Sequence, residues 1–378
     1  MVSNMETRLG NIAKIFTGKC NAQDAVEDGM YPLFDRSGEV KKSNSYFADC
    51  EAIIVPGEST TFIPRYYKGK FNLHQRAYCI NPNPNVNGVF LYYLIKANSP
   101  YFFSVATGAT VASLRLNNFL KMKVNLPELN VQNKIADILS NYDSLIEDNK
   151  NRIQILESEA EELYKEWFVR KDIDFENNTK DGKFLRFNEI ATIVRGCSYS
   201  TEQIDVDSGN LLVNLKNIAS FGGYNFGNEK FYVGDYKQEQ TVSKYDLIMG
   251  VTDMTQDRRC VGSVALCPRY DSIAVISADL IKINSTYPSI FLYCHFKFGN
   301  YSKLFAEYAN GANVLHLRPK YLEKSKIWLP TFKSTTLFCE KVKPLFDLIF
   351  NLEEVNSSLI KQRDLLLPRL ISSRLEVK

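Results

Sequence analysis

Short segments that combine glycine with polar side chains are the parts of this sequence best suited to binding chemistry. Two of them, Thr107-Gly-Ala-Thr110 and Asn310-Gly-Ala-Asn313, are each followed by an arginine, at Arg115 and Arg318. Amide and hydroxyl groups can read the edges of bases, arginine binds guanine edges or phosphates, and glycine lets a backbone approach a ligand closely. The alternative is a structural turn in both places, with the two arginines as capping or ion-pairing residues.

Other stretches of similar composition extend this candidate surface. They include the Thr252–Arg259 segment and the Gly222-Gly223-Tyr224 turn. Lysine and arginine on phosphates supply salt-dependent affinity, while polar side chains on base edges supply specificity. The residues predicted to contact DNA are Arg36, Ser37, Lys41, Lys42, Ser59, Thr60, Thr61, Arg65, Thr107, Gly108, Thr110, Arg115, Asn217, Tyr224, Thr255, Gln256, Arg258, Arg259, Asn310, Gly311, Asn313, His316, Arg318 and Lys320.

Motifs for catalysis are missing from the sequence. It contains no G-x-x-x-x-G-K-[ST] phosphate loop. A DNA amino-methyltransferase would need an Asn/Asp-Pro-Pro-aromatic tetrapeptide for the flipped base. The nearest strings, Asn81-Pro-Asn-Pro84 and Phe221–Gly227, are interpreted as turns. Asp253 and Asp257 have no evident partners for a nuclease metal site. We therefore expect a binding protein without catalytic residues of its own.

The cysteines and histidines do not suggest a metal site. The eight cysteines are scattered without a C-x-x-C pair, and the chain has three histidines. A zinc site would need clustered ligands, so reduced cysteines in the cytoplasm are the expected state. The start of the chain is polar, and no run approaches the roughly 18 apolar residues of a membrane span. We expect a soluble cytoplasmic protein that binds neither metal nor membrane.

The positions of these segments follow an internal duplication. Leu9-Gly-Asn-Ile-Ala-Lys-Ile-Phe-Thr-Gly18 matches Phe187-Asn-Glu-Ile-Ala-Thr-Ile-Val-Arg-Gly196 at an offset of 178 residues. The Thr107–Arg115 segment matches Asn310–Arg318 at an offset of 203 residues, and the match continues to a Leu-Pro pair in both copies. Ordered matches at both ends show that a globular unit occurs twice, with a middle that has diverged and grown by 25 residues (203 − 178).

Each copy is followed by a long helix with a heptad pattern. Apolar residues and one asparagine recur at alternating spacings of four and three, which is typical of a coiled coil. Two matched stripes favour packing of the helices on each other, and the alternative is that each packs on its own domain. The predicted seam contains Tyr142, Ile146, Asn149, Ile153, Leu156 and Leu163 in the first helix and Leu345, Ile349, Leu352, Asn356, Leu359 and Leu366 in the second.

Charge and composition support this division. Residues 1–127 carry 14 Lys and Arg against 9 Asp and Glu, residues 183–330 carry 17 against 14, and residues 128–170 carry 5 against 10. Two mildly basic globules therefore flank an acidic helix, which suits globules that touch phosphate. Short β-branched runs such as Ala52–Val55 and Ser272–Ile276 predict strands, and helices are expected over 89–97 and 290–308.

The predicted fold class is α+β, with two pseudo-symmetric globular domains separated by two long antiparallel coiled-coil helices. The expected boundaries are a first domain over 1–127, a first spacer helix over 128–170, a linker over 171–182, a second domain over 183–330 and a second spacer helix over 331–378. At about 1.5 Å per residue, the first helix would be roughly 60 Å long.

This duplicated arrangement resembles the specificity subunit of type I restriction–modification systems over essentially the whole chain. The resemblance rests on the repeated borders and on the helix opening Leu129-Asn-Val-Gln-Asn-Lys-Ile-Ala136. The family commonly has a Glu-Gln pair where this chain has Val131-Gln132, and the second opening, Ser334–Cys339, matches more weakly. The resemblance implies that the two globular domains are target recognition domains in inverted orientation, each reading half of a bipartite DNA site. It also implies that methyltransferase subunits dock around the spacer helices, which set the gap.

The resemblance also assigns the expected partners and cofactor. The partners are double-stranded DNA, DNA methyltransferase subunits and, in some complexes, restriction or translocase subunits. This chain is expected to bind no cofactor, and S-adenosylmethionine belongs to the partner methyltransferase. The alternative is a stand-alone sequence-specific DNA-binding protein, such as a repressor or the reader of another defence system, that acts without a methyltransferase.

Overall fold

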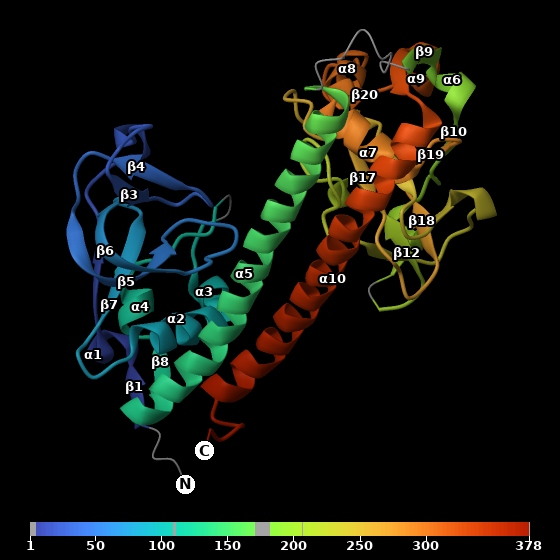
Figure 1. The fold of residues 1–378 in the computed structure, drawn as a ribbon. Coiled ribbons are helices and arrows are strands. Elements are labelled where there is room, and N and C mark those ends of the chain that lie inside the picture. The colour runs from blue at the N-terminus through green and yellow to red at the C-terminus, as the bar shows by residue number, and fades with distance from the viewer. Residues whose placement is uncertain (1–4, 109–110, 171–181, 206, 378) are drawn as a thin grey trace. The chain divides into compact units, whose positions relative to one another are not determined.

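The computed structural model describes residues 5–108, 111–170, 182–205 and 207–377. The chain divides into two compact units (Figure 1). Unit 1 contains the residues up to Glu147 together with those from Ser358 onward, and unit 2 contains Asp148–Ser357. Each unit therefore combines a globular part with segments of both long helices. The predicted linker lies outside the described residues except for Gly182, which begins a strand.

Unit 1 is built around one six-stranded sheet in the order β2-β7-β5-β6-β3-β4. Its central strand, β5, is continuously apolar from Ala52 to Val55, and these four residues are buried because other elements cover both faces of the sheet. The strands are β1 (Met5–Arg8), β2 (Ala13–Thr17), β3 (Tyr31–Phe34), β4 (Val40–Ser43), β5 (Ala48–Pro56), β6 (Arg65–Leu73), β7 (Ala77–Pro82) and β8 (Lys123–Leu126). The helices are α1 (Leu9–Ile12), α2 (Gly88–Ala97), α3 (Ser99–Val105) and α4 (Leu116–Leu120).

Unit 2 repeats this plan with a divided sheet. A four-stranded sheet β10-β19-β15-β17 accompanies a five-stranded sheet β11-β13-β12-β18-β14. Its strands are β9 (Gly182–Arg186), β10 (Ala191–Arg195), β11 (Ile204–Asp205), β12 (Asn210–Val213), β13 (Lys230–Tyr232), β14 (Thr241–Val242), β15 (Leu247–Gly250), β16 (Thr252–Asp253), β17 (Val264–Leu266), β18 (Ala274–Ile276), β19 (Leu280–Ser285), β20 (Leu315–His316) and β21 (Lys326–Pro330). Its helices are α6 (Phe187–Ile190), α7 (Ser289–Phe298), α8 (Tyr301–Glu307) and α9 (Pro319–Lys324).

The helix expected over 290–308 is divided in the structure. Helix α7 ends before Gly299, and α8 begins after Asn300. Asn300 has a φ of 63°, a left-handed conformation that a continuous α-helix does not contain. The apolar pattern predicted the helical content correctly, but the Gly-Asn pair allows the chain to turn between the two helices.

The duplication is visible in the strand register. In unit 1, β1 pairs with β8 so that Met5 faces Leu126, and in unit 2 Lys183 of β9 faces Leu329 of β21. Likewise Ala13 faces Pro82 between β2 and β7, and Ala191 faces Ser285 between β10 and β19. The offsets between these positions, 178 and 203 residues, are those of the sequence repeat. Both copies therefore place equivalent residues in equivalent pairs.

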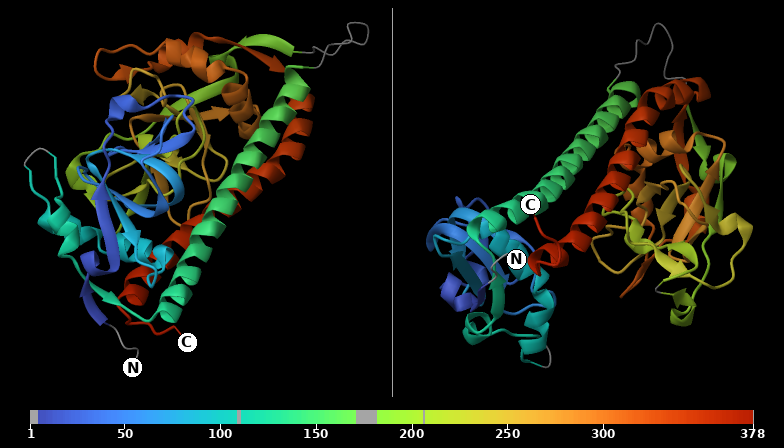
Figure 2. Two further views of the ribbon diagram at one scale, coloured as in Figure 1. Left: turned by 90° about the vertical axis from the view of Figure 1, so that its left-hand side faces the viewer. Right: turned by 90° about the horizontal axis from the view of Figure 1, so that it is seen from below.

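Two helices of 40 residues, α5 (Leu129–Phe168) and α10 (Phe332–Ile371), pack together. In unit 2, Asn149 of α5 contacts Asn356 of α10, and Trp167 contacts Phe338. In unit 1, Arg363 of α10 makes an ion pair with Asp143 of α5, at 2.5 Å. In each unit the pairing is antiparallel, and the helix segments lie side by side in both views of Figure 2.

Every predicted seam residue is buried or half-buried. The asparagine pair is the polar layer of the seam: the Asn149 Nδ2 donates to Asn356 Oδ1 at 2.9 Å, and the two side chains are 8% and 3% exposed. Buried amides stabilise a helix pair only where they find each other, so this layer specifies which residues lie opposite. The α+β class and the packed antiparallel helices are thus confirmed.

We expect the single variants Asn149→Leu and Asn356→Leu each to lower the free energy of unfolding by about 1–3 kcal/mol, because the remaining amide is buried opposite a leucine. The double variant should recover most of this loss, since both unsatisfied amides are removed. Urea unfolding of the full chain measures the three values. The control is Asn151→Leu, at an exposed position on α5, with an effect below about 0.5 kcal/mol. Additive single effects would refute the polar layer.

Candidate nucleic-acid interface

In unit 1, the loop that follows the central strand β5 lies against the Gly-Ala segment. The backbone N–H of Leu114 donates to the carbonyl of Gly57 at 2.8 Å, and Ser59 donates to Ala112 at 3.2 Å. Glu58 is bridged to Ser113, which is itself bridged to Thr107 in the narrow hairpin. This pairing brings predicted contact residues that are about 50 positions apart in sequence, Ser59–Thr61 and Thr107–Gly108, onto one edge of the unit.

Glu58 forms ion pairs with two arginines at this edge. Its Oε2 accepts from Nη1 of Arg36 and from Nη1 of Arg76, each at 2.8 Å. Hydrogen bonding by Arg76, opposed by burial and assisted by Arg36, lowers the pKa of the Glu58 carboxyl. Arg65 lies close by, because its Nη2 donates to the carbonyl of Ser37 at 2.7 Å. The structure thus brings the predicted contact residues Arg36, Ser37 and Arg65 together, and Arg76 is a member of the cluster that sequence reasoning missed.

The two predicted lysines on β4 have different surroundings. Lys41 makes an ion pair with the buried Asp35 at 2.8 Å. Asp35 also accepts from the backbone N–H and the hydroxyl of Ser37, at 2.7 and 2.6 Å. Burial alone would raise the pKa of Asp35, but Lys41 and Ser37 lower it overall. Lys42 is the next residue of the strand and therefore points to the other face. Lys41 serves the loop structure, and Lys42 is not part of the Arg36 cluster.

Unit 2 contains the same construction. The backbone N–H of Leu317 donates to the carbonyl of Val251 at 2.8 Å, which matches the Leu114–Gly57 bond of unit 1. Strand β16 pairs with β20, so that Thr252 faces His316. The Gln256 side chain donates to the carbonyl of Ala312 at 3.1 Å. The loop after β15 and the second Gly-Ala segment therefore meet, and they gather the predicted residues Thr255, Gln256, Asn310, Gly311, Asn313 and His316.

Asp253 organises the loop in unit 2. Its side chain is 3% exposed and accepts from four donors: Thr255 N at 2.8 Å, Thr255 Oγ1 at 2.7 Å, Cys260 N at 2.6 Å and Val261 N at 3.2 Å. Burial alone would raise the pKa of this carboxyl, but the donors lower it overall. No partner of Asp253 was evident from the sequence because three of the four donors are backbone N–H groups.

The backbone conformation and the close packing of the two Gly-Ala segments require glycine at positions 108 and 311. Gly108 and Gly311 have φ values of 115° and 156°. A Cβ on Gly108 would lie 2.4 Å from the carbonyl oxygen of Val111, and one on Gly311 would lie 1.9 Å from that of Val314. The turn interpretation therefore holds for the glycines themselves. Asn310 and Asn313 remain exposed at the hairpin, and Thr110 lies outside the described residues.

Two predicted contact residues are corrected by the structure. Asn217 is fully buried, and its side chain accepts from the backbone N–H of Asn214 at 3.0 Å and donates to the carbonyl of Asn225 at 3.1 Å. The Tyr224 hydroxyl donates to Glu229 at 2.5 Å and accepts from Tyr270 at 2.8 Å. Both side chains satisfy internal polar groups. Neither is available to DNA in this structure.

The remaining predicted residues are cations that differ in their interactions with the rest of the protein. Arg115 and Arg318 are the N-caps of α4 and α9, where the backbone is extended, and both side chains are exposed. Their side chains make no cap hydrogen bond. Arg259 makes an exposed ion pair with Asp257 at 2.8 Å, and Arg258, in the same loop, has a φ of 55°. Lys320 is exposed on α9, two residues after Arg318 in sequence.

A surface hollow in unit 2 adds a residue that sequence reasoning missed. Arg195, at the end of β10, lines a hollow of about 240 Å³ together with His316 and Arg318. Arg195 is the position before the repeated glycine, and the equivalent residue of unit 1 is Thr17. Only the long-range pairing of β10 with β19 and of β16 with β20 brings it beside the Gly-Ala segment.

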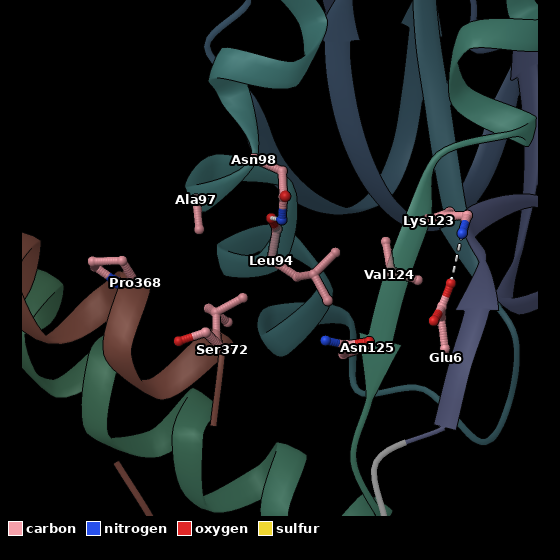
Figure 3. Close-up of a pocket in the computed structure, with 10 residues that line it drawn as sticks. Glu6, Leu94, Ala97, Asn98, Lys123, Val124, Asn125, Pro368 and Ser372 are labelled. Carbon is pink, nitrogen blue, oxygen red and sulfur yellow. Dashed lines mark hydrogen bonds and ion pairs between the residues drawn. The ribbon is translucent and has the colours of Figure 1, made fainter. Parts of the chain in front are cut away.

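Another cavity lies away from the candidate interface and has a different character. It measures about 460 Å³ in unit 1, and its lining includes Leu94 of α2, Asn125 of β8 and Ser372 (Figure 3). At its rim Lys123 forms an ion pair with Glu6 at 2.9 Å, which lowers the pKa of the Glu6 carboxyl. Its cation is therefore already neutralised. This cavity is separate from the predicted contact residues.

Among the described residues, no group of three or more His, Cys, Asp or Glu side chains is placed to hold a metal ion. Within the same residues, none of the helices combines the length and the apolar character that crossing a bilayer requires. The eight cysteines are free thiols.

Comparison with known proteins agrees with the duplicated plan. Residues 1–158 match the family described as the type I restriction modification DNA specificity domain. The chain is 26% identical over 395 residues to the EcoDI specificity subunit of Escherichia coli, covering 94% of this chain and 84% of that protein. It is 26% identical over 316 residues to the MjaIX specificity subunit of Methanocaldococcus jannaschii, covering 79% and 72%.

One solved structure shares the fold over the full length. The type I restriction–modification S subunit from M. genitalium superposes with a TM-score of 0.65 at 15% identity, covering 100% of this chain and 97% of that one. The resemblance predicted from the repeated borders is confirmed.

We expect Asp253→Asn to lower the free energy of unfolding by about 1.5–3 kcal/mol at neutral pH, because four donors lose a charged acceptor. The folded-state pKa is lowered, so this stabilisation is present above the unfolded value near 3.9 and lost as pH falls through the folded pKa. Urea unfolding should show a constant difference between wild type and variant from about pH 5 to 7, shrinking below about pH 4.

The matched control is Asp257→Asn in the same loop, where an exposed ion pair should contribute less than about 0.5 kcal/mol. Equal effects of the two substitutions would show that Asp253 does not organise the loop.

Proposed function

Starting from the similarity of this chain to type I restriction specificity subunits, we propose that each unit reads one half of a bipartite DNA site. The chain then acts in the cytoplasm with methyltransferase subunits, which hold S-adenosylmethionine and carry out the chemistry. In this proposal the chain itself is not an enzyme. In some complexes of this kind, a restriction or translocase subunit would also join.

The observation that carries the proposal is the repetition of one loop pairing. In both units the loop after the central strand is bonded to the Gly-Ala hairpin, through Leu114 N–Gly57 O and Leu317 N–Val251 O. The framework is the same in the two units, but the side chains it presents differ: Arg36, Arg65 and Arg76 in unit 1, and Gln256, Asn310 and Asn313 in unit 2. Different side chains on equivalent frameworks are suited to different half-sites.

The two long helices support the second part of the proposal, that they set the gap and dock the methyltransferase. Each helix contributes segments to both units. In this proposal the length of the helices therefore determines the spacing of the two half-sites that the units read. In unit 2, Ile155 of α5 is 65% exposed and Leu348 of α10 is 45% exposed, although both helices are otherwise rich in charge. In this proposal the methyltransferase subunits contact the helices at such exposed positions.

The alternative is a stand-alone DNA-binding protein that acts without a methyltransferase. Its sequence-specific binding would be complete in the isolated chain, and its helices would have no methyltransferase to recruit. Co-purification with an amino-methyltransferase and methylation of DNA only by the joint complex would exclude it.

The first test exchanges one reader. Replacing residues 20–106 with the equivalent segment of a related subunit should change one half of the methylated sequence, since the second unit keeps its own loop pairing. Methylation mapping of DNA modified by the complex with its methyltransferase reads both halves. The matched control exchanges residues 198–309 instead. This variant should change only the other half of the methylated sequence. A change in both halves after either exchange would contradict independent reading.

The second test lengthens the helices. Four residues inserted after Asn151 in α5 and four after Glu354 in α10 extend both helices near the Asn149–Asn356 layer. At about 1.5 Å per residue this adds roughly 6 Å, or about two base pairs at 3.4 Å each. We expect a longer gap between unchanged half-sites in methylation mapping.

If the four-residue variant fails to assemble, seven residues at the same places preserve the seam and should add about three base pairs. An active variant with the original gap would show that the helices do not set the spacing.

A further inference from the structure

Three exposed side chains with donor groups converge on the hollow in unit 2. Arg195 comes from the end of β10, His316 from β20, and Arg318 from the N-cap of α9. The hollow measures about 240 Å³. Its floor includes Val251 and Leu317, the two residues joined by the loop-pairing hydrogen bond. The site is therefore built on the same framework as the candidate DNA interface.

The two arginines of the hollow are not neutralised by the protein. Within residues 5–108, 111–170, 182–205 and 207–377, neither guanidinium makes an ion pair or a side-chain hydrogen bond. Asp279, which follows the lining residue Ala278 in the sequence, accepts from the hydroxyl of Thr252 at 2.9 Å. By contrast, Arg36 and Arg76 of unit 1 share Glu58. Two uncompensated cations and an imidazole in one small hollow form a site for an anion.

The size and exposure of the hollow favour one kind of anion. Its three donor side chains are exposed on the surface, so they can reach an anion that belongs to a ligand lying mostly outside the hollow. A DNA phosphate meets this condition, because it projects from the duplex and needs two or three donors. The equivalent positions of unit 1 are Thr17, Ser113 and Arg115, which retain one cation. The site is therefore a property of unit 2.

We infer that Arg195, His316 and Arg318 bind one backbone phosphate of duplex DNA and so fix the position of the second reader on its half-site. This inference rests on the proposed function, since it requires DNA bound by unit 2. The contact carries position and salt-dependent affinity but no sequence preference. Base recognition is left to the neighbouring hairpin and loop.

The test uses the full chain in complex with its methyltransferase and a duplex that contains the mapped target. Arg195→Gln and Arg318→Gln should each weaken binding at 50 mM salt, with the slope of log K against log salt less steep by about 0.9. The deficit should therefore shrink about threefold between 50 and 200 mM salt. The matched control is Arg269→Gln, an exposed arginine beyond the opposite end of the β15–β17 pair, with an unchanged slope.

A second measurement locates the phosphate. Duplexes with one neutral methylphosphonate at a time should include one position that weakens binding by the wild type and has little further effect on Arg195→Gln. The methylated sequence should be the same for wild type and both variants.

Separate outcomes overturn the two proposals. Lack of specific DNA binding by the wild-type complex would contradict the proposed function itself. Specific binding with unchanged slopes in both variants, or a changed methylated sequence, would overturn the phosphate site alone. Loss of methyltransferase assembly in the variants would assign the hollow to a protein contact and also overturn it.

Discussion

The candidate interface depends on one backbone interaction, the hydrogen bond that joins the loop after the central strand to the Gly-Ala hairpin. In unit 1 it runs from Leu114 to Gly57, and in unit 2 from Leu317 to Val251, each at 2.8 Å. Because main-chain atoms make this bond, it does not restrict the side chains on either strand. The framework is thus retained while the residues it presents change, which is the requirement for a protein that reads different sequences with one fold.

A buried carboxylate also holds one loop in each unit, which is the loop between β3 and β4 in unit 1 and the loop after β15 in unit 2. Asp35 holds Ser37 and Lys41 in unit 1, and Asp253 holds Thr255, Cys260 and Val261 in unit 2. The two aspartates do not occupy equivalent positions in the repeat. Ordering the loops before binding reduces the conformational entropy that DNA binding must overcome. The cost of burying a carboxylate is offset by these charge-assisted hydrogen bonds.

The sequence predicted those features that depend on local or repeated patterns. The repeat borders correspond to strands in matching register, and the four–three spacing predicted the seam that buries Asn149 and Asn356. Prediction from the sequence was wrong for side chains whose role depends on long-range packing. Asn217 and Tyr224 resemble contact residues in composition but satisfy internal polar groups. Arg76 and Arg195 were missed because strand pairing over long separations brings them to the interface.

The two units also use their cations differently, and the difference follows from carboxylate placement. Glu58 holds Arg36 and Arg76 in fixed directions, and each guanidinium still has donors to spare, because arginine carries five N–H groups. A guanidinium that is oriented and partly neutralised gains little from a diffuse phosphate charge but keeps the geometry needed for a guanine edge. Arg195 and Arg318 have no such carboxylate partner among the described residues, so their full charge would be available to a phosphate of the DNA backbone. In the proposed function, unit 1 would be suited to direct base reading by arginine, whereas unit 2 would divide the tasks between cations for the phosphates and hairpin amides for the bases.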